Sequence, residues 1–328
     1  MSYRHRPIVD TIPGYRQGKP APALPGVHSY KVSSNENPFG PLPSVTKAIA
    51  EHALERINRY PDMRGWEVVS RIADRYGLAP EQVQLGCGST EVITQLVSLV
   101  AGPGDEVVYP WRRIAAVTDR TRLGILNNPN NPTSASLADE DARRVVAAVP
   151  ADVIVLFDEA YFQFNTDPDT SVAKDLMHDH PNIVIAHTFS KAYGLAGLRI
   201  GYAMGAADVI EGMQKVALPF GVSDVAQQAA LASMDVRDEL MRRVDDIVVE
   251  RGRMVAALRE QGWTLPEPYG NFFWLELGKR TAEAADRFTA VGLSVRAFPD
   301  EGIRISIGER LANDRVLEVC AALRDEGF

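Results

Sequence analysis

Residues 187–201 read HTFSKAYGLAGLRIG, a lysine and an arginine set among hydroxyl residues and glycines. The apolar run at 183–186 precedes them and is typical of a buried strand. Lys191 therefore comes just past a strand end, where open α/β sheets place their reactive groups. A lone loop lysine is most often a solvated surface residue. Here Ser190 offers a hydroxyl and Arg199 a guanidinium, so the set predicts an anion site beside a reactive amine.

Apolar runs without polar alternation recur through this part of the chain, at 107–109, 123–126, 153–157 and 183–186. Such runs are typical of strands covered on both faces, as in a mostly parallel sheet between helices. We therefore predict an α/β fold. Ser136, with Asp139 three residues later, has the pattern of a capping box and predicts that a helix starts at Ser136.

The pattern changes after a long helical stretch that begins near Ser223 and ends at Gly262. Short strands with helices between them are expected beyond it, at 271–275, 293–296 and 303–307. This predicts a smaller α+β domain. The expected divisions are an N-terminal arm with part of the small domain at 1–45, a large domain at 46–255 and the small domain at 256–328.

Composition restricts the class of protein. The chain has 328 residues and a formal net charge of −8, which argues against nucleic acid or an anionic membrane as a partner. The cysteines, Cys87 and Cys320, lack metal-type spacing, and we expect no bound metal. The N-terminal residues lack the apolar core of a signal peptide, and no apolar run is long enough to span a membrane. These features predict a cytoplasmic protein.

A glycine turn at 86–88 precedes Ser89 and Thr90, which open a helical pattern. The N-terminus of a helix presents free N–H groups to an anion, and the helix dipole adds to the attraction. Ordinary N-capping explains the two hydroxyl residues equally well. The turn therefore indicates a phosphate site only in combination with other features.

Polar residues also follow two of the apolar runs. Asp158 and Tyr161 come after the run at 153–157, and Asn131 comes after the run at 123–126. Pyridoxal phosphate needs a lysine amine, a carboxylate at its pyridine nitrogen, donors to its ring oxygen and a cup for its phosphate. Each residue alone has an ordinary structural explanation. Together they predict a pyridoxal phosphate site.

A further arginine lies in a strand whose alternation is clear. Ile303, Ile305 and Ile307 are expected on one face, which places Arg304 on the other. A guanidinium binds a carboxylate through two parallel hydrogen bonds. Arg304 is therefore a candidate for the substrate carboxylate, with a surface ion pair as the alternative explanation.

Six motifs together resemble the fold-type-I aminotransferases, and within them the histidinol-phosphate aminotransferases and the actinobacterial-type aromatic amino acid (phenylalanine) aminotransferases. The resemblance covers nearly the whole chain. The motifs are SNENP (34–38), RYPD (59–62), GCGS (86–89), NPNNPT (128–133), DEAY (158–161) and SKAYGLAGLR (190–199).

The resemblance implies that Lys191 forms the Schiff base and moves a proton between substrate and cofactor, while Asp158 pairs with the pyridine nitrogen. It implies that Asn131 and Tyr161 bond the ring oxygen. The residues implied to hold the phosphate are Ser89, Thr90, Ser190 and Arg199, with Tyr60 reaching in from the other subunit of a homodimer. The implied substrate-binding residues are Arg304, Arg296, Arg315 and Asn37.

Two substrate classes stay open. Arg296 and Arg315 fall where histidinol-phosphate enzymes place arginines near the substrate phosphate, whereas residues 39–43, 110–112 and 218–223 look more like the aromatic aminotransferases. We expect histidinol phosphate first, because the arginine pair needs an anion to explain it. The expected reaction is ping-pong transamination with 2-oxoglutarate. A decarboxylase of the threonine-phosphate type and a non-catalytic cofactor-binding protein are the alternatives.

One departure from the resembled families lies after Arg113. There, a few tens of residues are missing, including an aromatic residue that stacks on the cofactor ring. A true deletion would remove one helix–strand unit and open one face of the cofactor. We favour the other explanation, omission of the segment from this sequence, because every other motif is present.

Overall fold

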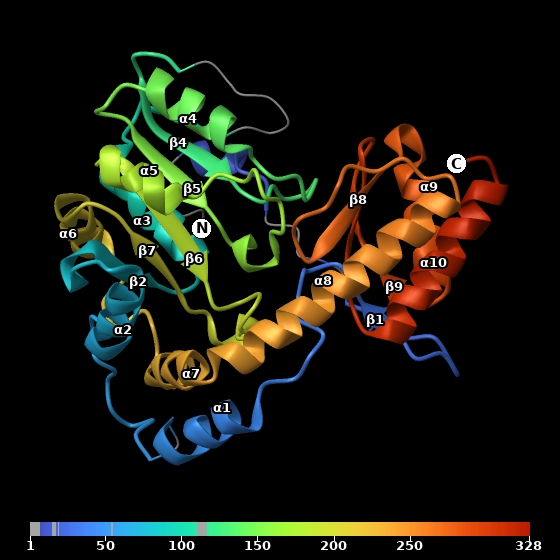
Figure 1. Cartoon of the computed structure of the whole chain (residues 1–328), viewed down its shortest axis with the longest axis horizontal. Coiled ribbons are helices and arrows are strands. Elements are labelled where there is room, and N and C mark those ends of the chain that lie inside the picture. Colours follow the sequence, from blue (N-terminus) through green and yellow to red (C-terminus); the bar gives the residue numbers. More distant parts are fainter. Residues whose placement is uncertain (1–6, 15–17, 19, 54, 110–116) are drawn as a thin grey trace, which may run out of the picture.

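The computed structural model describes residues 7–14, 18, 20–53, 55–109 and 117–328. Within these residues the main sheet has six strands, in the order β2-β7-β6-β5-β4-β3 (Figure 1). Strands β3 to β6 run parallel, and β7 runs antiparallel to both of its neighbours. In sheet order the strands are β2 (Val83–Gly86), β7 (Gly201–Met204), β6 (Ile183–Thr188), β5 (Ile154–Asp158), β4 (Thr121–Asn127) and β3 (Glu106–Val108).

Helices cover both faces of this sheet, which is why its strands lack polar alternation. On β5, Leu156 packs into one apolar cluster, while Val155 and Phe157 pack into the other. Burying such a side chain stabilises the fold by about 1.5–3 kcal/mol. The first cluster includes α3 (Ser89–Val100) and α6 (Ala207–Val216); the second includes α2 (Trp66–Tyr76), α4 (Asp139–Ala148), α5 (Ala173–Asp179) and α7 (Asp224–Asp235). The mostly parallel α/β fold expected from the sequence is confirmed.

The long helix α8 (Arg237–Glu260) leads from the main sheet to a second group of elements (Figure 1). These include a three-stranded antiparallel sheet in the order β10-β11-β8, and β1 paired in parallel with β9. The N-terminal segment thus packs with the C-terminal part. The elements are β1 (Tyr30–Lys31), β8 (Phe272–Glu276), α9 (Thr281–Ala290), β9 (Leu293–Ser294), β10 (Arg296–Phe298), β11 (Gly302–Ser306) and α10 (Arg310–Asp325).

One helix boundary differs from the sequence expectation. The helix expected to start at Ser136 starts at Asp139, and the Ser136 hydroxyl donates to Thr170 Oγ1 at 2.9 Å instead of capping it. The backbone N–H of Asp139 donates to Asp169 O, so a loop distant in sequence takes the place of the cap. The remaining short elements are η1 (Pro7–Thr11), α1 (Pro43–Ala48), η2 (Ile49–Ala53), η3 (Pro80–Gln82), η4 (Phe162–Phe164), η5 (Ala196–Leu198) and η6 (Gly278–Arg280).

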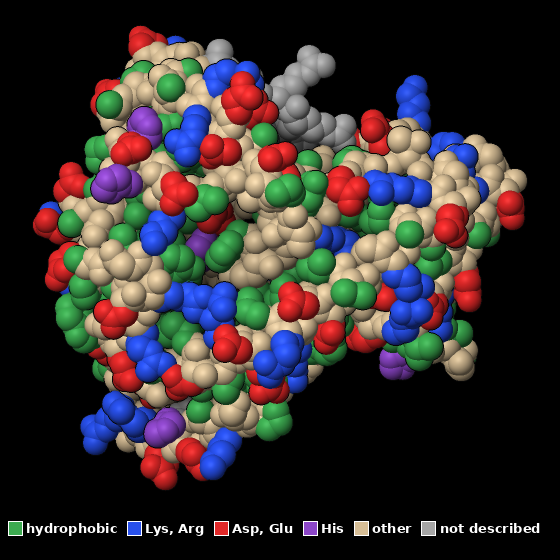
Figure 2. Space-filling model, in the orientation of Figure 1, with side chains coloured by type: hydrophobic (Ala, Val, Ile, Leu, Met, Phe, Trp, Pro, Cys, Tyr) green, Lys and Arg blue, Asp and Glu red, His purple; other side chains and the backbone are tan. Residues whose placement is uncertain are grey.

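Acidic and basic side chains are interspersed over the face drawn in Figure 2, with no broad area of one sign. Among the described residues, no helix combines the length and the apolar character that crossing a membrane requires.

Candidate active site

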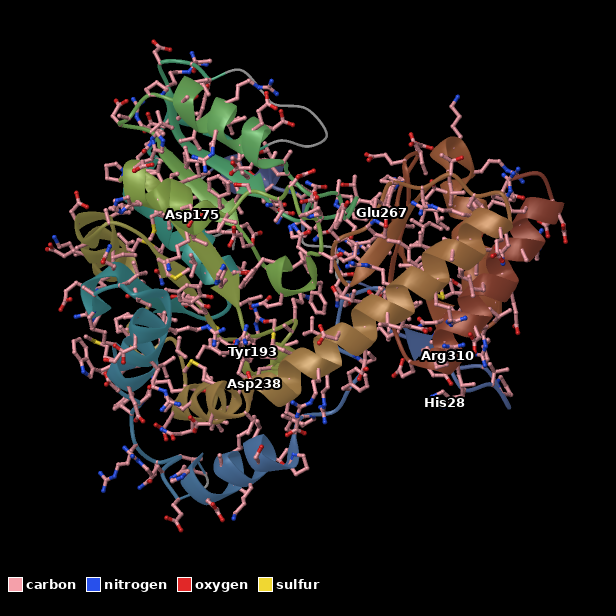
Figure 3. The ribbon with its side chains drawn as sticks, in the orientation of Figure 1. His28, Asp175, Tyr193, Asp238, Glu267 and Arg310 are labelled. Carbon is pink, nitrogen blue, oxygen red and sulfur yellow. The ribbon has the colours of Figure 1, made fainter. Side chains whose placement is uncertain are left out.

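A cavity of about 470 Å³ lies where the carboxyl ends of β5 and β6 face the small sheet. Figure 3 shows the two parts that flank it, with Asp175 on α5 in one and Arg310 on α10 in the other. Most of the predicted site residues line this cavity, although they come from distant parts of the chain. They are Ser89, Thr90, Asn131, Asp158, Tyr161, Ser190, Lys191, Arg199, Arg296 and Arg304.

Lys191 lies in the loop after β6, with its side chain half-buried in the cavity wall. Its Nζ donates a hydrogen bond of 3.0 Å to the Ser34 carbonyl and lies 5.7 Å from the ring centre of Tyr161. Burial, followed by the positive charge of Arg304, lowers the pKa of Lys191 to about 8. About one tenth of this amine is therefore neutral at pH 7 and able to act as a nucleophile, far more than for an ordinary lysine.

Asp158 ends β5, and its side chain faces the same cavity. Within the described chain its carboxylate accepts one hydrogen bond, from the Ala160 N–H at 3.3 Å. Burial raises the pKa of Asp158 to about 6, against the lowering effect of that N–H. A carboxylate that is partly desolvated and weakly bonded gains from a cationic partner. The site therefore fits the protonated pyridine nitrogen of pyridoxal phosphate.

One part of the cavity, here called the anion corner, lies between the start of α3 and the loop after β6. Its residues are Ser89, Thr90, Ser190 and Arg199. Gly88, the residue before α3, has a φ of +75°, and a side chain there would collide with the guanidinium of Arg199. Arg199 Nη1 donates to Ser190 Oγ at 3.4 Å. Hydroxyls, a guanidinium and the free N–H groups of a helix N-terminus converge here, which is a donor set suited to a phosphate.

Tyr161 is buried, and its hydroxyl accepts hydrogen bonds from Asn131 Nδ2 at 3.4 Å and from Asn35 Nδ2 at 3.1 Å. Burial raises the pKa of Tyr161, so it remains a neutral phenol that can donate. Asn35 is fully buried, and its Oδ1 accepts from Ser306 Oγ at 2.9 Å. Sequence reasoning gave Asn35 no role, although it lies in the SNENP motif.

Arg304 and Arg296 lie opposite each other on β11 and β10. Arg304 is 8% exposed and donates to Asn131 Oδ1 at 2.7 Å and to Ser33 O. Ile303 and Ile305 are fully buried on the other face of β11, as the alternation predicts. The two guanidiniums give this end of the cavity a positive charge suited to anionic substrate groups.

Three predicted site residues lie outside the cavity lining. Tyr60 is 80% exposed and stacks on Phe220, with ring centres 4.7 Å apart. Arg315 Nη1 donates to the carbonyls of His28 at 2.7 Å and Val291 at 3.1 Å. Their predicted roles stay predictions.

Asn37 is the third of these residues. Its Nδ2 donates to the carbonyls of Lys191 at 3.1 Å and Ala192 at 3.2 Å, so Asn37 fixes the lysine loop. Its predicted substrate role stays a prediction. Sequence reasoning missed several residues of the lining, namely Gly18, Ser33, Ser34, Glu36 and Phe298. Across the described ranges, no three His, Cys, Asp or Glu side chains are grouped so as to hold a metal ion.

The chain matches the family described as "Aminotransferase class I and II" over residues 28–111 and 113–323. It is 42% identical to an aromatic amino acid aminotransferase of Streptomyces avermitilis, covering 98% of each chain. It is 42% identical to one of Cutibacterium acnes, covering 97% of this chain and 98% of the relative. A histidinol-phosphate aminotransferase of Sinorhizobium meliloti, solved with pyridoxal-5′-phosphate, superposes with a TM-score of 0.83 at 26% identity, covering 98% of this chain and 99% of that one.

The comparisons also bear on the segment expected to be missing after Arg113. The alignment to the Streptomyces relative spans 352 positions, against 328 residues in this chain, so part of the relative has no counterpart here. The family match is interrupted at residue 112. Residues 110–116, which include the Trp111 motif, lie outside the described residues.

The likeness to the curated relatives extends along almost the whole chain, and it includes the segments that supply the lysine, the carboxylate and the anion corner. The sheet and the small sheet that carry these residues superpose on solved aminotransferases. On the family match and this identity, the chain belongs to the class I and II aminotransferases.

Proposed function

We propose that this aminotransferase binds pyridoxal 5′-phosphate and moves an amino group from an aromatic amino acid to a 2-oxo acid such as 2-oxoglutarate. The observation that supports the cofactor most directly is the meeting of Lys191, Asp158 and the anion corner in one cavity. The donor and acceptor use the site in turn, as ping-pong kinetics require, because one cavity serves both.

When bound, pyridoxal phosphate supplies an electron-withdrawing ring that stabilises negative charge at the substrate Cα. Asp158 holds a proton on the ring nitrogen, which keeps that ring electron-withdrawing. Tyr161 and Asn131 direct hydrogen bonds to the ring oxygen. The phosphate is held by Ser89, Thr90, Ser190 and Arg199, whose hydroxyl and guanidinium groups line the anion corner.

Lys191 has two tasks in this proposal. It first anchors the cofactor covalently. Its amine would also act as the base that takes the proton from the substrate Cα and as the acid that later gives it back. A pKa of about 8 suits both directions, because the amine accepts and releases protons readily near neutral pH. Arg304 holds the substrate carboxylate through its two terminal nitrogens.

The relatives that are 42% identical act on aromatic amino acids by name, which supports that substrate class for this chain. Phe298 lines the cavity and offers an apolar wall to a flat side chain. Histidinol phosphate is the second candidate, and Arg296 supports it because its positively charged guanidinium belongs to the cavity lining. Arg315 does not line the cavity, which weakens the argument from an arginine pair.

The experiment compares kcat/KM for phenylalanine and for histidinol phosphate, with 2-oxoglutarate as acceptor, in the wild type and in Arg296→Ala. The proposal expects a higher kcat/KM for phenylalanine, and a loss confined to histidinol phosphate in the variant. A higher kcat/KM for histidinol phosphate would reverse the substrate assignment. Release of carbon dioxide without transfer to 2-oxoglutarate would contradict transamination.

We further propose a homodimer in which Tyr60 reaches the partner's site. Exposed apolar side chains are frequent in the two segments that carry Tyr60 and its stacking partner Phe220, and a surface of this kind favours burial against another chain. They are Ile57, Met63, Trp66, Leu218 and Phe220. Tyr60 and Phe220 stack with an interplanar angle of 28° and thus present one continuous aromatic surface.

The division into domains at 1–45, 46–255 and 256–328 is also proposed, and the pairing of β1 with β9 supports the joint packing of the first and last segments. We propose the cytoplasm as the place of action on the basis of composition alone.

A further inference from the structure

Beneath the cavity lies a buried cluster of titratable side chains that the proposed mechanism does not use. His187 Nε2 lies 2.8 Å from Glu159 Oε2, and His187 Nδ1 lies 3.0 Å from the hydroxyl of Tyr202 and 3.2 Å from that of Tyr76. Phe162 stacks on the imidazole, with ring centres 4.2 Å apart. The cluster joins the ends of β5, β6 and β7 to α2.

Burial favours opposite charges on the Glu159 carboxylate and the His187 imidazole. The side chains of His187 and Glu159 are 3% and 9% exposed. A buried carboxylate without a counter-charge is strongly destabilising. Both ring nitrogens of His187 face oxygen atoms, so a protonated imidazole has a hydrogen-bond acceptor on each side. An ion pair of carboxylate and imidazolium therefore satisfies both groups.

The cluster lies directly beside Asp158, the carboxylate proposed to pair with the cofactor nitrogen. Glu159 is the residue after Asp158, and the Glu159 N–H donates to the carbonyl of Ala186, the residue before His187. Burial is the main cause that raises the pKa of Asp158, and the negative charge of Glu159 raises it further. An uncompensated Glu159 would thus raise the pKa of Asp158 further and would add a negative charge near the cofactor.

We propose that Glu159 and His187 form a buried ion pair that positions Asp158 and cancels the charge of Glu159, so that Asp158 stays ionised beneath the cofactor ring. This inference rests on the proposed role of Asp158. Glu159 and His187 are positioning residues, since neither lines the cavity.

The other titratable and charged groups near His187 are few among the described residues. Tyr202 on β7 and Tyr76 on α2 contact its Nδ1, while Arg75 on α2 and Tyr193 in the lysine loop act on the two hydroxyls. Burial raises the pKa of Tyr76 and, strongly, that of Tyr202, so both stay neutral and add no charge to the pair.

The experiment compares the wild type, His187→Gln and Glu159→Gln/His187→Gln, each loaded with pyridoxal phosphate, with Glu140→Gln on the exposed start of α4 as the control. The measurement is the pH midpoint at which the absorbance of the lysine-bound cofactor changes. His187→Gln leaves Glu159 negative, and a nearby negative charge makes a cationic nitrogen harder to deprotonate. We expect its midpoint to rise by about 0.5–1 pH unit.

The double variant Glu159→Gln/His187→Gln carries no net charge in the pair, like the wild type, and we expect its midpoint to return to the wild-type value. Damage to packing alone would move the double variant at least as far as the single one. An unchanged midpoint in His187→Gln, or no return in the double variant, overturns the ion pair.

Two further results keep the test decisive. If His187→Gln does not fold, Tyr202→Phe serves instead, because it removes one hydrogen-bond acceptor for His187 Nδ1 and leaves the ring packing intact. We expect a smaller rise of the pH midpoint in this variant. An unchanged midpoint counts against the ion pair. A wild type that shows no bound-cofactor absorbance, with Lys191→Ala indistinguishable from it, overturns the proposed function and this inference together. A normal wild-type band with unshifted variants overturns this inference alone.

Discussion

Arg304 Nη1 on β11 donates a hydrogen bond of 2.7 Å to the side-chain oxygen of Asn131, which follows β4. This bond joins the small sheet to the main sheet across the cavity. The residue proposed for the substrate carboxylate thereby touches a residue proposed for the cofactor ring. We infer that substrate binding and the placement of the ring oxygen contacts depend on each other.

Arg304→Lys tests this dependence. A lysine keeps the charge but loses the planar pair of donors, so it cannot form two parallel hydrogen bonds to a carboxylate while it also bonds Asn131. We expect KM to rise about tenfold or more for the amino donor and the 2-oxo acid alike. Steady-state kinetics with both substrates measures it, and a rise for one substrate alone contradicts a shared carboxylate site.

Lys191→Ala should abolish transamination while the fold persists, because the amine has no other source in the cavity lining. The variant loses the hydrogen bond from Lys191 Nζ to the Ser34 carbonyl, a cost of about 1 kcal/mol that the fold tolerates. Single-turnover assays measure the loss, and circular dichroism checks the fold. Lys215→Ala, which removes an exposed lysine paired with Glu211, is the matched control and should keep full activity.

Asp158→Asn should change the pH dependence of stability in the cofactor-free chain. The pKa of Asp158 rises from 3.8 to about 6 on folding, so the folded state binds the proton more tightly than the unfolded state. Stability from this group is complete below about pH 4 and is lost as pH rises through about 6.

We therefore expect the Tm of Asp158→Asn to exceed that of the wild type at pH 7 and the difference to shrink toward pH 4. Thermal unfolding followed across this range provides the measurement. Asp175→Asn, at an exposed position on α5, should show no such trend. A wild-type advantage that grows with pH would show the opposite linkage.

Asn35 has a φ of +51°, a backbone conformation that glycine adopts freely and alanine does not. Asn35→Ala and Asn35→Gly both lose the side-chain hydrogen bonds that Asn35 donates to Tyr161 and accepts from Ser306. Alanine adds backbone strain, so we expect it to lower the free energy of unfolding by about 1 kcal/mol more than glycine does. Urea denaturation of the two variants decides this, and equal stabilities would count against the strain.

Tyr60 can be tested by mixing two inactive or weakened chains. If Tyr60 serves the partner's site, a dimer of Tyr60→Ala with Lys191→Ala holds one intact site. Random reassociation should then restore about a quarter of the wild-type activity, since half the dimers are mixed and each has one such site. No recovery, with mixed dimers demonstrated by differently tagged chains, would place Tyr60 outside the partner's site.

The sequence predicts much of the site because its chemistry follows local pattern. Lys191 and Asp158 each come directly after an apolar run, and parallel strands bring their carboxyl ends to one edge of a sheet. Arg304 follows from strict alternation in a single strand. In each case a few consecutive residues carry the signal, so no tertiary contact is needed to find it.

Other features depend on contacts between residues far apart in the chain. Asn35 holds Tyr161 only because β11, which carries Ser306, packs beside it. His187 and Glu159 meet because β5 and β6 are neighbours in the sheet, and Arg315 turns to the carbonyls of His28 and Val291 because β1 pairs with β9. Residues 187–201 thus determine by themselves that an amine lies beside an anion site. The order and packing of the strands decide which buried groups hold that amine's partners in place, because hydrogen bonds between distant residues form only after the strands have assembled.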